Sequence, residues 1–381
     1  MTDYDRQYIA LLKEILNKGI KTDNRTGIGT LKIPSWDFFF DIGHDFPILQ
    51  TKKIAAGSAI REMLWIWQMQ SNDVRDLHSR NIHIWDEWMI DPDGIYRVYE
   101  PEGKCPYDPD REVPVLDVYS IPLDNVNKAP KLKYTEDGQI MTAKSLKPGR
   151  TIKFAKWYGK DFAYTIGTAY GFITARYKFA QNLIDTIKHN PTDRRIIKSL
   201  WQDEFLRTAV LPSCVWSTEW DVTDGYLNLI VHQRSCDVPL GLPFNVTQYA
   251  ALQRMIAQVT NMKVGFLWFT IKDAHIYENQ LEGVYEQLRR AQLYDDLSEM
   301  SREEVLAFQQ QTSEIMKMLD TGSLEYRKAN ADYMAADLLL KPCASELLLD
   351  PSVDDFFEFD YPRNVKVRTR NMGGIKFPIA Q

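Results

Sequence analysis

One short stretch of the sequence gathers four kinds of side chain that could support nucleophilic chemistry: thiol, guanidinium, carboxylate and amide. Within residues 209–245 they belong to Cys214, Arg234, Cys236, Asp237 and Asn245. A cysteine attacks as its thiolate, and a neighbouring guanidinium stabilises that form. The stretch therefore predicts either an ordinary core hairpin or the wall of an active site with a cysteine nucleophile.

The same stretch has the pattern of a β-hairpin. Strands are expected at 214–222 and 226–234, joined by the three-residue turn Thr-Asp-Gly. This register places Cys214 opposite Arg234 on one face, and a slip of one residue would turn Arg234 to the other face. The alternative is that Cys214 is a small buried hydrophobe and Arg234 a charge at the rim.

Glu62 is a second candidate for proton chemistry. It lies in an apolar helical pattern beside Ile60, Met63 and Leu64. A partly desolvated carboxyl holds its proton more tightly and can act as a general acid or base. The alternative is an ion pair with Arg61 or Lys53.

Three further polar features each allow two interpretations. Asn245 at an expected helix start is either a cap or an amide that recognises a ligand. His275 and Tyr277 alternate along a strand, so they share a face that is either a polar pocket or half exposed. Arg194 and Arg195 are adjacent on an expected strand, so their side chains point to opposite faces. They are either a solvated pair of charges or part of an interface.

These residues need a scaffold, and the apolar periodicity predicts an α+β fold. Helices are expected at 3–18, 58–68, 175–191 and 245–260, and strands at 30–42, 194–201 and 264–277, besides the hairpin. Residues 98–163 are rich in Pro, Asp, Lys and Gly, and residues 296–350 are polar and helical. We interpret both as insertions in a single domain, 1–381.

Composition narrows the class of protein. A net charge of −6, with 44% apolar residues, does not favour a bulk nucleic-acid binder. The sequence has no apolar run long enough to cross a membrane, and its N-terminus is charged rather than signal-like. The four cysteines form no CxxC pair, which predicts neither a zinc site nor a disulfide framework and favours a reducing cytoplasm, that of the host if a phage encodes the chain.

Nine motifs, in order, resemble the thymidylate synthase family, which includes the pyrimidine-nucleotide hydroxymethylases. They are DNRTGIGT (23–30), FPILQTKK (46–53), REMLWIWQMQSND (61–73), IHIWDEW (82–88), IGTAYG (166–171), DRRII (193–197), LPSCV (211–215), HQRSCDVPLGLPFN (232–245) and DAHIYENQ (273–280). The resemblance covers about 1–97, 164–296 and the last thirty residues. It implies an α+β sandwich whose mixed sheet forms a homodimer interface.

The resemblance also implies roles for individual residues. Catalysis would use Cys214, which attacks C6 of dUMP, with Glu62, Tyr170, Arg234, Asp237 and Asn245. Binding of dUMP would use Arg25, Gln233, Ser235, Asn245, His275 and Tyr277, with Arg194 and Arg195 from the partner of a homodimer. The folate co-substrate, 5,10-methylenetetrahydrofolate, would contact Lys52, Trp85, Trp88, Asp237, Leu240, Gly241 and Phe244, and the C-terminal KFPIA would close over it. No metal, flavin, membrane or direct DNA binding is expected.

The sequence leaves two outcomes for the one-carbon unit. Trp85 and Leu211 would shield the reacting carbon from water, as in a synthase that makes dTMP. Ser213, Lys272 and Gln381 depart from the synthase pattern and would admit or position water. On these three positions we favour a dUMP hydroxymethylase, of the kind used in phage DNA modification. The alternatives are a thymidylate synthase and, in another class, a catalytically idle regulatory or RNA-binding homologue.

Overall fold

The computed structural model describes residues 1–24, 27–101 and 106–379. The chain divides into two compact units. The first contains Met1–Met63, Ile184–Ile197 and Ser217–Ala380, and the second contains Leu64–Leu183 and Lys198–Trp216. The single-domain interpretation stays a prediction, and the two units are described separately.

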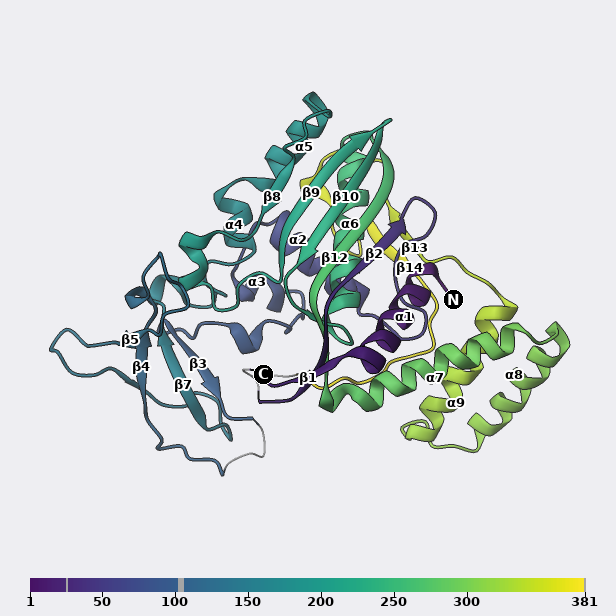
Figure 1. Ribbon diagram of the computed structural model, residues 1–381, viewed down its shortest axis with the longest axis horizontal. Helices are drawn as coiled ribbons and strands as arrows, with labels where there is room; N and C mark the ends of the chain where they lie inside the picture. The colour runs from purple at the N-terminus through teal and green to yellow at the C-terminus, as the bar shows by residue number, and fades with distance from the viewer. Residues whose placement is uncertain (25–26, 102–105, 380–381) are drawn as a thin grey trace. The chain divides into compact units, whose positions relative to one another are not determined.

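A seven-stranded mixed sheet has most of its strands in the first unit (Figure 1). Its order is β1 (Ile20–Thr22), β2 (Thr30–Asp41), β12 (Lys263–Tyr277), β10 (Tyr226–Gln233), β9 (Val215–Thr223) and β8 (Ile197–Ser199), with β11 (Cys236–Asp237) beside β12. β2 runs antiparallel to β12, whereas β10 and β11 run parallel to it. Together with the helices, this sheet confirms the α+β class.

Alternation along β2 and β12 gives the sheet two different faces. Phe38 and Phe269 are fully buried, and α6 (Gly241–Val259) packs against β10 and β12. Phe39, Phe266 and Trp268, an odd number of positions away along the same strands, are each more than 40% exposed. Successive side chains of a strand point to opposite faces, so one face is core and the other is an uncovered aromatic surface.

The remaining elements of the first unit surround this core. They are α1 (Asp3–Lys18), α7 (Leu281–Ser298), α8 (Arg302–Lys317), α9 (Leu324–Leu340), β13 (Glu346–Leu349) and β14 (Val365–Arg368). α1 begins with a capping box in which Thr2 accepts from the backbone of Asp5. Because the sequence carries this signal and a regular apolar stripe, the predicted 3–18 helix has the correct bounds.

The hairpin corrects the predicted register. β9 ends at Thr223 and β10 begins at Tyr226, so the turn contains only Asp224 and Gly225. Both have positive φ, 52° and 76°, which is the two-residue turn that matches strand twist. A two-residue turn places Asp221 opposite Asn228, and their side chains are hydrogen-bonded at 3.1 Å. The predicted register, and with it the pairing of Cys214 with Arg234, was therefore one residue off.

Two predicted elements are shorter than expected. The expected 175–191 helix is two helices, α4 (Gly171–Arg176) and α5 (Phe179–His189). Lys178 between them has φ of +48°, which a continuous helix does not allow. The expected 194–201 strand shortens to β8.

Four elements cross the division between the two units. They are α2 (Ala56–Trp67), α5, β8 and β9.

The second unit includes the first predicted insertion, which has a small sheet of its own. Its strands are β3 (Ile95–Tyr99), β7 (Ile152–Trp157), β4 (Val113–Asp117), β5 (Lys131–Leu132) and β6 (Thr142–Ala143). Ile95, Val115 and Ile152 belong to its apolar core. The alternation of buried and partly exposed residues is short, with only three buried residues in β3. Because Pro- and Asp-rich loops surround it, this alternation does not stand out in the sequence.

The second predicted insertion is helical, as expected. α8 and α9 pack together around a core that includes Leu297, Val305, Ala335 and Met372. Met372 comes from the C-terminal segment, so this insertion and the chain end share one core. The other short elements are α3 (Val74–His78) and the 3-10 helices η1 (Asp86–Trp88), η2 (Val118–Ser120), η3 (Lys160–Phe162), η4 (Asp203–Thr208), η5 (Glu278–Gln280) and η6 (Phe356–Glu358).

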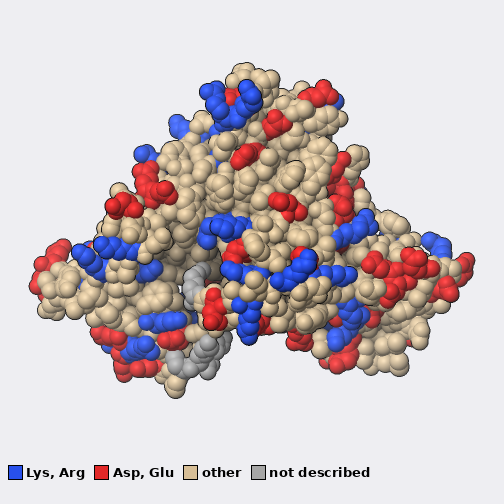
Figure 2. Space-filling model, viewed as in Figure 1, with Lys and Arg blue, Asp and Glu red and all other residues tan. Residues whose placement is uncertain are grey.

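The surface and the helices agree with the broad class of protein predicted from composition. Basic and acidic side chains are interspersed over the face drawn in Figure 2. Among the residues that the structure describes, no helix is both long and apolar enough to span a bilayer. Cytoplasmic location and the absence of DNA binding stay predictions.

Candidate active site

Cys214 lies directly before β9, in the second unit, and is half buried. Its backbone N–H donates to the Tyr170 hydroxyl at 2.8 Å. Tyr170 stands at the start of α4 with a positive φ of 47°, and its ring is 5.6 Å from that of Trp85. The Trp85 ring is in turn 5.6 Å from that of Trp88. The structure thus brings four predicted site residues together, which we call the cysteine group.

A chain of side-chain hydrogen bonds that is buried at two of its three residues forms the second cluster, in the first unit. The Asn245 amide donates to Gln248 Oε1 at 3.1 Å, and the Gln248 amide donates to Glu62 Oε2. Glu62 and Gln248 are 7% and 4% exposed. We call Glu62, Gln248 and Asn245 the amide relay. It connects a predicted acid–base residue to a predicted base-recognition residue.

The amide relay corrects one expectation and adds one residue. α6 begins at Gly241, so Asn245 lies inside the helix rather than at its cap. Gln248 was not singled out from the sequence. Its signal was present: a glutamine in an apolar helix, three residues after Asn245 and therefore on the same helical face.

Asp237 is held in a buried polar environment between a helix start and the C-terminal segment. Its carboxylate accepts from the Gln280 amide at 3.0 Å and from the Leu240 N–H at 3.1 Å. The same Gln280 amide donates to the Pro378 carbonyl at 3.2 Å. Burial raises the pKa of Asp237, although the bonds from Gln280 and Leu240 act against this shift. A carboxylate with a shifted pKa is a candidate for ligand contact.

Lys52 is buried close to the same carboxylate. Its ammonium donates to the Pro239 carbonyl and lies 4.5 Å from the centre of the Phe377 ring. Burial lowers the pKa of Lys52 to about 7, and Asp237 offsets only part of that effect. Both groups shift towards their neutral forms, because desolvation outweighs their mutual attraction.

The end of β12 gathers the residues predicted to hold the sugar and phosphate of a nucleotide. Ser235 donates to Asp273 at 3.0 Å, and Lys32 forms an ion pair with Asp273 at 3.0 Å. The rings of His275 and Tyr277 are 5.1 Å apart and nearly perpendicular, which confirms that they share a face. Asp273 and Lys32 were not predicted as members of this cluster. Their register, Lys32 opposite His275, is a property of the strand pairing.

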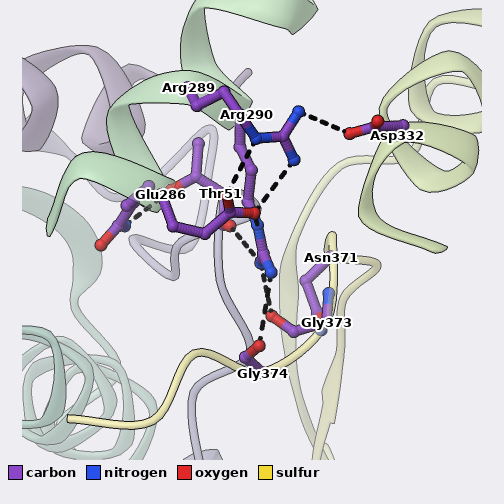
Figure 3. Close-up of polar contacts among 9 residues, drawn as sticks. Thr51, Glu286, Arg289, Arg290, Asp332, Asn371, Gly373 and Gly374 are labelled. Carbon is purple, nitrogen blue, oxygen red and sulfur yellow. Dashed lines mark hydrogen bonds and ion pairs between the residues drawn. The ribbon is translucent and has the colours of Figure 1, made fainter. Parts of the chain in front are cut away.

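A buried arginine fixes the C-terminal segment to α7 (Figure 3). Arg290 is 3% exposed and donates to the carbonyls of Thr51 and Gly373 at 3.1 and 3.0 Å. Arg289 pairs with Asp332 of α9 at 2.8 Å, and Glu286 accepts from both arginines. This network connects the helical insertion to the segment predicted to close the site.

Arg194 and Arg195 are in the first unit. Arg195 pairs with Asp193 at 2.9 Å and is 86% exposed at its side chain. Arg194 lines a hollow of about 380 Å³ together with the exposed Phe39, Phe266 and Trp268. The two arginines therefore lie at or near the uncovered sheet face.

The remaining predicted residues have the following positions. Arg234 follows the last residue of β10, and Gln233 is buried and donates to the Ser235 carbonyl. Leu240, Gly241 and Phe244 form the cap and first turn of α6. Arg25 and Gln381 lie outside the described residues. The roles of all these residues, and the absence of a metal and a flavin, stay predictions.

Comparison with known proteins gives one consistent result. A family model described as "Thymidylate synthase" matches residues 6–329. A thymidylate synthase of Clostridium beijerinckii is 37% identical over 290 residues, which are 76% of this chain and 83% of that protein. The thymidylate synthase of Bacillus phage phi3T is 32% identical over 311 residues, 77% of this chain and 86% of its own.

The solved structures agree. The thermostable thymidylate synthase A from Bacillus subtilis superposes with a TM-score of 0.62 at 28% identity, and the match covers 100% of this chain and 99% of that one.

Proposed function

Because the chain belongs to the thymidylate synthase family, as its motifs predicted, we propose that it converts dUMP to dTMP with 5,10-methylenetetrahydrofolate as co-substrate. The observation that carries this proposal is the match of about three quarters of the chain to relatives named thymidylate synthase. The proposed enzyme is a transferase of one-carbon groups.

The cysteine group supplies the nucleophile in this proposal. C5 of uracil is a poor nucleophile, and addition of the Cys214 thiolate at C6 converts it to an enolate, which divides one difficult step into easier ones. The hydrogen bond from the Cys214 N–H to Tyr170 fixes the backbone that carries the thiol. Preorganisation of this kind lowers the barrier because the group need not be ordered during the reaction.

The amide relay recognises the base and handles protons. The Asn245 amide offers a donor and an acceptor, which matches N3–H and O4 of uracil and stabilises negative charge on O4. Its orientation is set by Gln248, which also holds Glu62. Glu62 then serves as the acid–base residue, through ordered water.

The residues fit a folate co-substrate. In the second unit, Trp85 and Trp88 offer aromatic faces for a pterin. In the first unit, the Asp237 carboxylate offers acceptors for N–H groups. The co-substrate supplies the one-carbon unit and the hydride, which no side chain can provide. This chain's own contribution is to bind, orient and exclude water.

Hydroxymethylation, our first interpretation of the sequence, has weaker support than reductive methylation. The relatives that match are thymidylate synthases. Of the three residues that favoured water capture, Lys272 is exposed on β12, Ser213 is buried, and Gln381 lies outside the described residues. The match to relatives named thymidylate synthase therefore favours reductive methylation.

The uncovered sheet face supports a homodimer. Phe39 stacks with Phe266 at 4.8 Å, and both stay exposed beside Trp268. Exposed aromatic patches of this kind mark interaction surfaces. In the proposed dimer this face is buried, and Arg194 and Arg195 reach the partner's nucleotide phosphate. Sedimentation of the wild type and of Trp268→Glu tests this: the variant should be monomeric, and an unchanged dimer would exclude this face.

The test of function is an incubation of the pure protein with dUMP and the folate. Dihydrofolate absorbance is followed, and the nucleotide product is identified by mass. We expect dTMP and dihydrofolate in equal amounts. Hydroxymethyl-dUMP without dihydrofolate would establish water capture instead. No product, with dUMP still bound, would support the idle homologue.

A further inference from the structure

Two histidines and an aspartate converge in the second unit, outside the residues that the proposed reaction uses. They are His78, the last residue of α3, His83 in the following loop, and Asp86, the first residue of η1. One nitrogen of each imidazole and one carboxylate oxygen all lie within 4.8 Å of one another. Among the described residues, this is the group of His, Cys, Asp and Glu side chains with metal-binding geometry.

The three side chains already face a common point. His78 Nε2 is 2.6 Å from Asp86 Oδ1, and His83 Nδ1 is 3.1 Å from Asp86 Oδ2. The two imidazoles are stacked with their centres 4.9 Å apart. All three are accessible, with side-chain exposures of 31%, 58% and 39%. An ion could therefore enter from solvent without local unfolding.

We propose that His78, His83 and Asp86 form a binding site for a first-row divalent transition-metal ion, for which Zn²⁺ is the natural probe. Imidazole nitrogen and carboxylate oxygen are typical ligands of these ions, at about 2.0–2.2 Å. Ligand atoms around one such ion are up to about 4 Å apart. Small side-chain rotations that displace the ligand atoms by about 1 Å are therefore enough to close the site. Water completes the coordination.

The site would connect two segments on either side of a buried aromatic residue. His78 ends α3, whereas Asp86 begins η1 directly after Trp85, which is 7% exposed. A bound ion therefore cross-links the two ends of the nine-residue segment from His78 to Asp86 and stabilises the folded state. This role does not depend on the proposed reaction, and the test uses no nucleotide or folate.

The prediction of no metal from the sequence depended on the spacing of the cysteines and on the lack of clustered histidine ligands, whereas the fold brings His78 and His83 together. The spacing here, His-x4-His-x2-Asp, is not a helical metal motif, because the helix ends at His78. Only the turn after α3 brings His83 and Asp86 back to His78.

The experiment is calorimetric titration of the EDTA-treated full-length protein with Zn²⁺, together with Co²⁺ absorption spectra. We expect one ion for each chain, with a Co²⁺ spectrum of nitrogen and oxygen ligands and without a thiolate band. His83→Ala should weaken binding at least about tenfold, since loss of even a supporting partner costs about that much. Circular dichroism verifies that this exposed substitution leaves the fold intact.

His44→Ala is the matched control. His44 is also exposed and also contacts a carboxylate, Asp41 at 2.8 Å, but belongs to no three-ligand group among the described residues. Its loss should leave Zn²⁺ affinity unchanged. Absence of binding at millimolar Zn²⁺, a thiolate spectrum, or equal affinity in the wild type and His83→Ala would each overturn the proposal.

Discussion

The cysteine group and the amide relay hold their functional side chains in different ways. The Cys214 backbone N–H donates to the Tyr170 hydroxyl, and the Tyr170 ring contacts Trp85. In the relay, Glu62, Gln248 and Asn245 are held by their side chains, and two of them are buried. A buried polar group that loses its partner pays the full desolvation cost, whereas a half-buried thiol does not. The cysteine group should thus tolerate substitution structurally, and the relay should not.

The largest effect is expected from Cys214→Ala, which separates chemistry from stability. Turnover should fall at least about 10⁴-fold, as when a nucleophile is removed elsewhere. The free energy of unfolding should change by no more than about 1 kcal/mol, because the side chain is half buried. Steady-state kinetics and urea unfolding measure the two quantities.

Cys343→Ala is the control for the cysteine group, since Cys343 is also half buried and its thiol contacts only a backbone carbonyl. Its turnover should match the wild type. Retained turnover in Cys214→Ala would contradict the nucleophile assignment.

Lys52 extends the comparison to a buried charge. Burial sets its pKa to about 7 in the folded protein, against about 10.4 in the unfolded chain. Between these values the unfolded state holds the extra proton, so the free energy of unfolding should rise as pH increases from about 7 to about 10. Lys52→Met should remove this dependence of stability on pH.

Urea unfolding of the wild type and Lys52→Met, from mildly acidic to mildly alkaline pH, provides the measurement. The exposed neighbour in Lys53→Met is the control and should keep the wild-type slope. Parallel curves for the wild type and Lys52→Met would show that the lysine is solvated.

Gln248→Leu breaks the amide relay at its centre. Glu62 and Asn245 both lose a hydrogen-bond partner, so we expect a loss of about 1–3 kcal/mol in stability. Turnover should also fall by about 10²-fold, the contribution of a positioned acid–base residue. Both effects distinguish the relay from the cysteine group.

Gln292→Leu removes an exposed glutamine that bonds to Asp296 and should change neither quantity. If Gln248→Leu lost turnover but kept the free energy of unfolding of the wild type, the relay would contribute to catalysis and not to stability.

The smallest effect is expected from Tyr170→Phe. It removes the acceptor for the Cys214 N–H and keeps the ring that contacts Trp85. One neutral hydrogen bond contributes about 0.5–1.5 kcal/mol, so turnover should fall by about tenfold at most. Tyr177→Phe, which loses a bond to the exposed Glu204, is the comparison variant. A loss as large as that of Cys214→Ala would assign Tyr170 a direct chemical role.

Local signals in the sequence determined much of this protein. The capping box at Thr2 and the apolar stripe predict α1 correctly, and alternation predicts β2 and β12 to within about two residues. The family motifs indicated the fold and the family, which the family model and the superposition confirm. Such signals succeed because capping and periodicity act over only a few residues.

The tertiary structure decided what depends on long-range contacts. The hairpin register depends on positive φ at Asp224 and Gly225, which makes a two-residue turn. The sequence Thr-Asp-Gly is also compatible with a three-residue turn, so it does not determine the register. The amide relay connects residues 186 positions apart, and His83 meets His78 only after the helix has ended. Periodicity can assign a side chain to a face, but which distant side chain it meets depends on how the elements pack, because that contact carries no local signal.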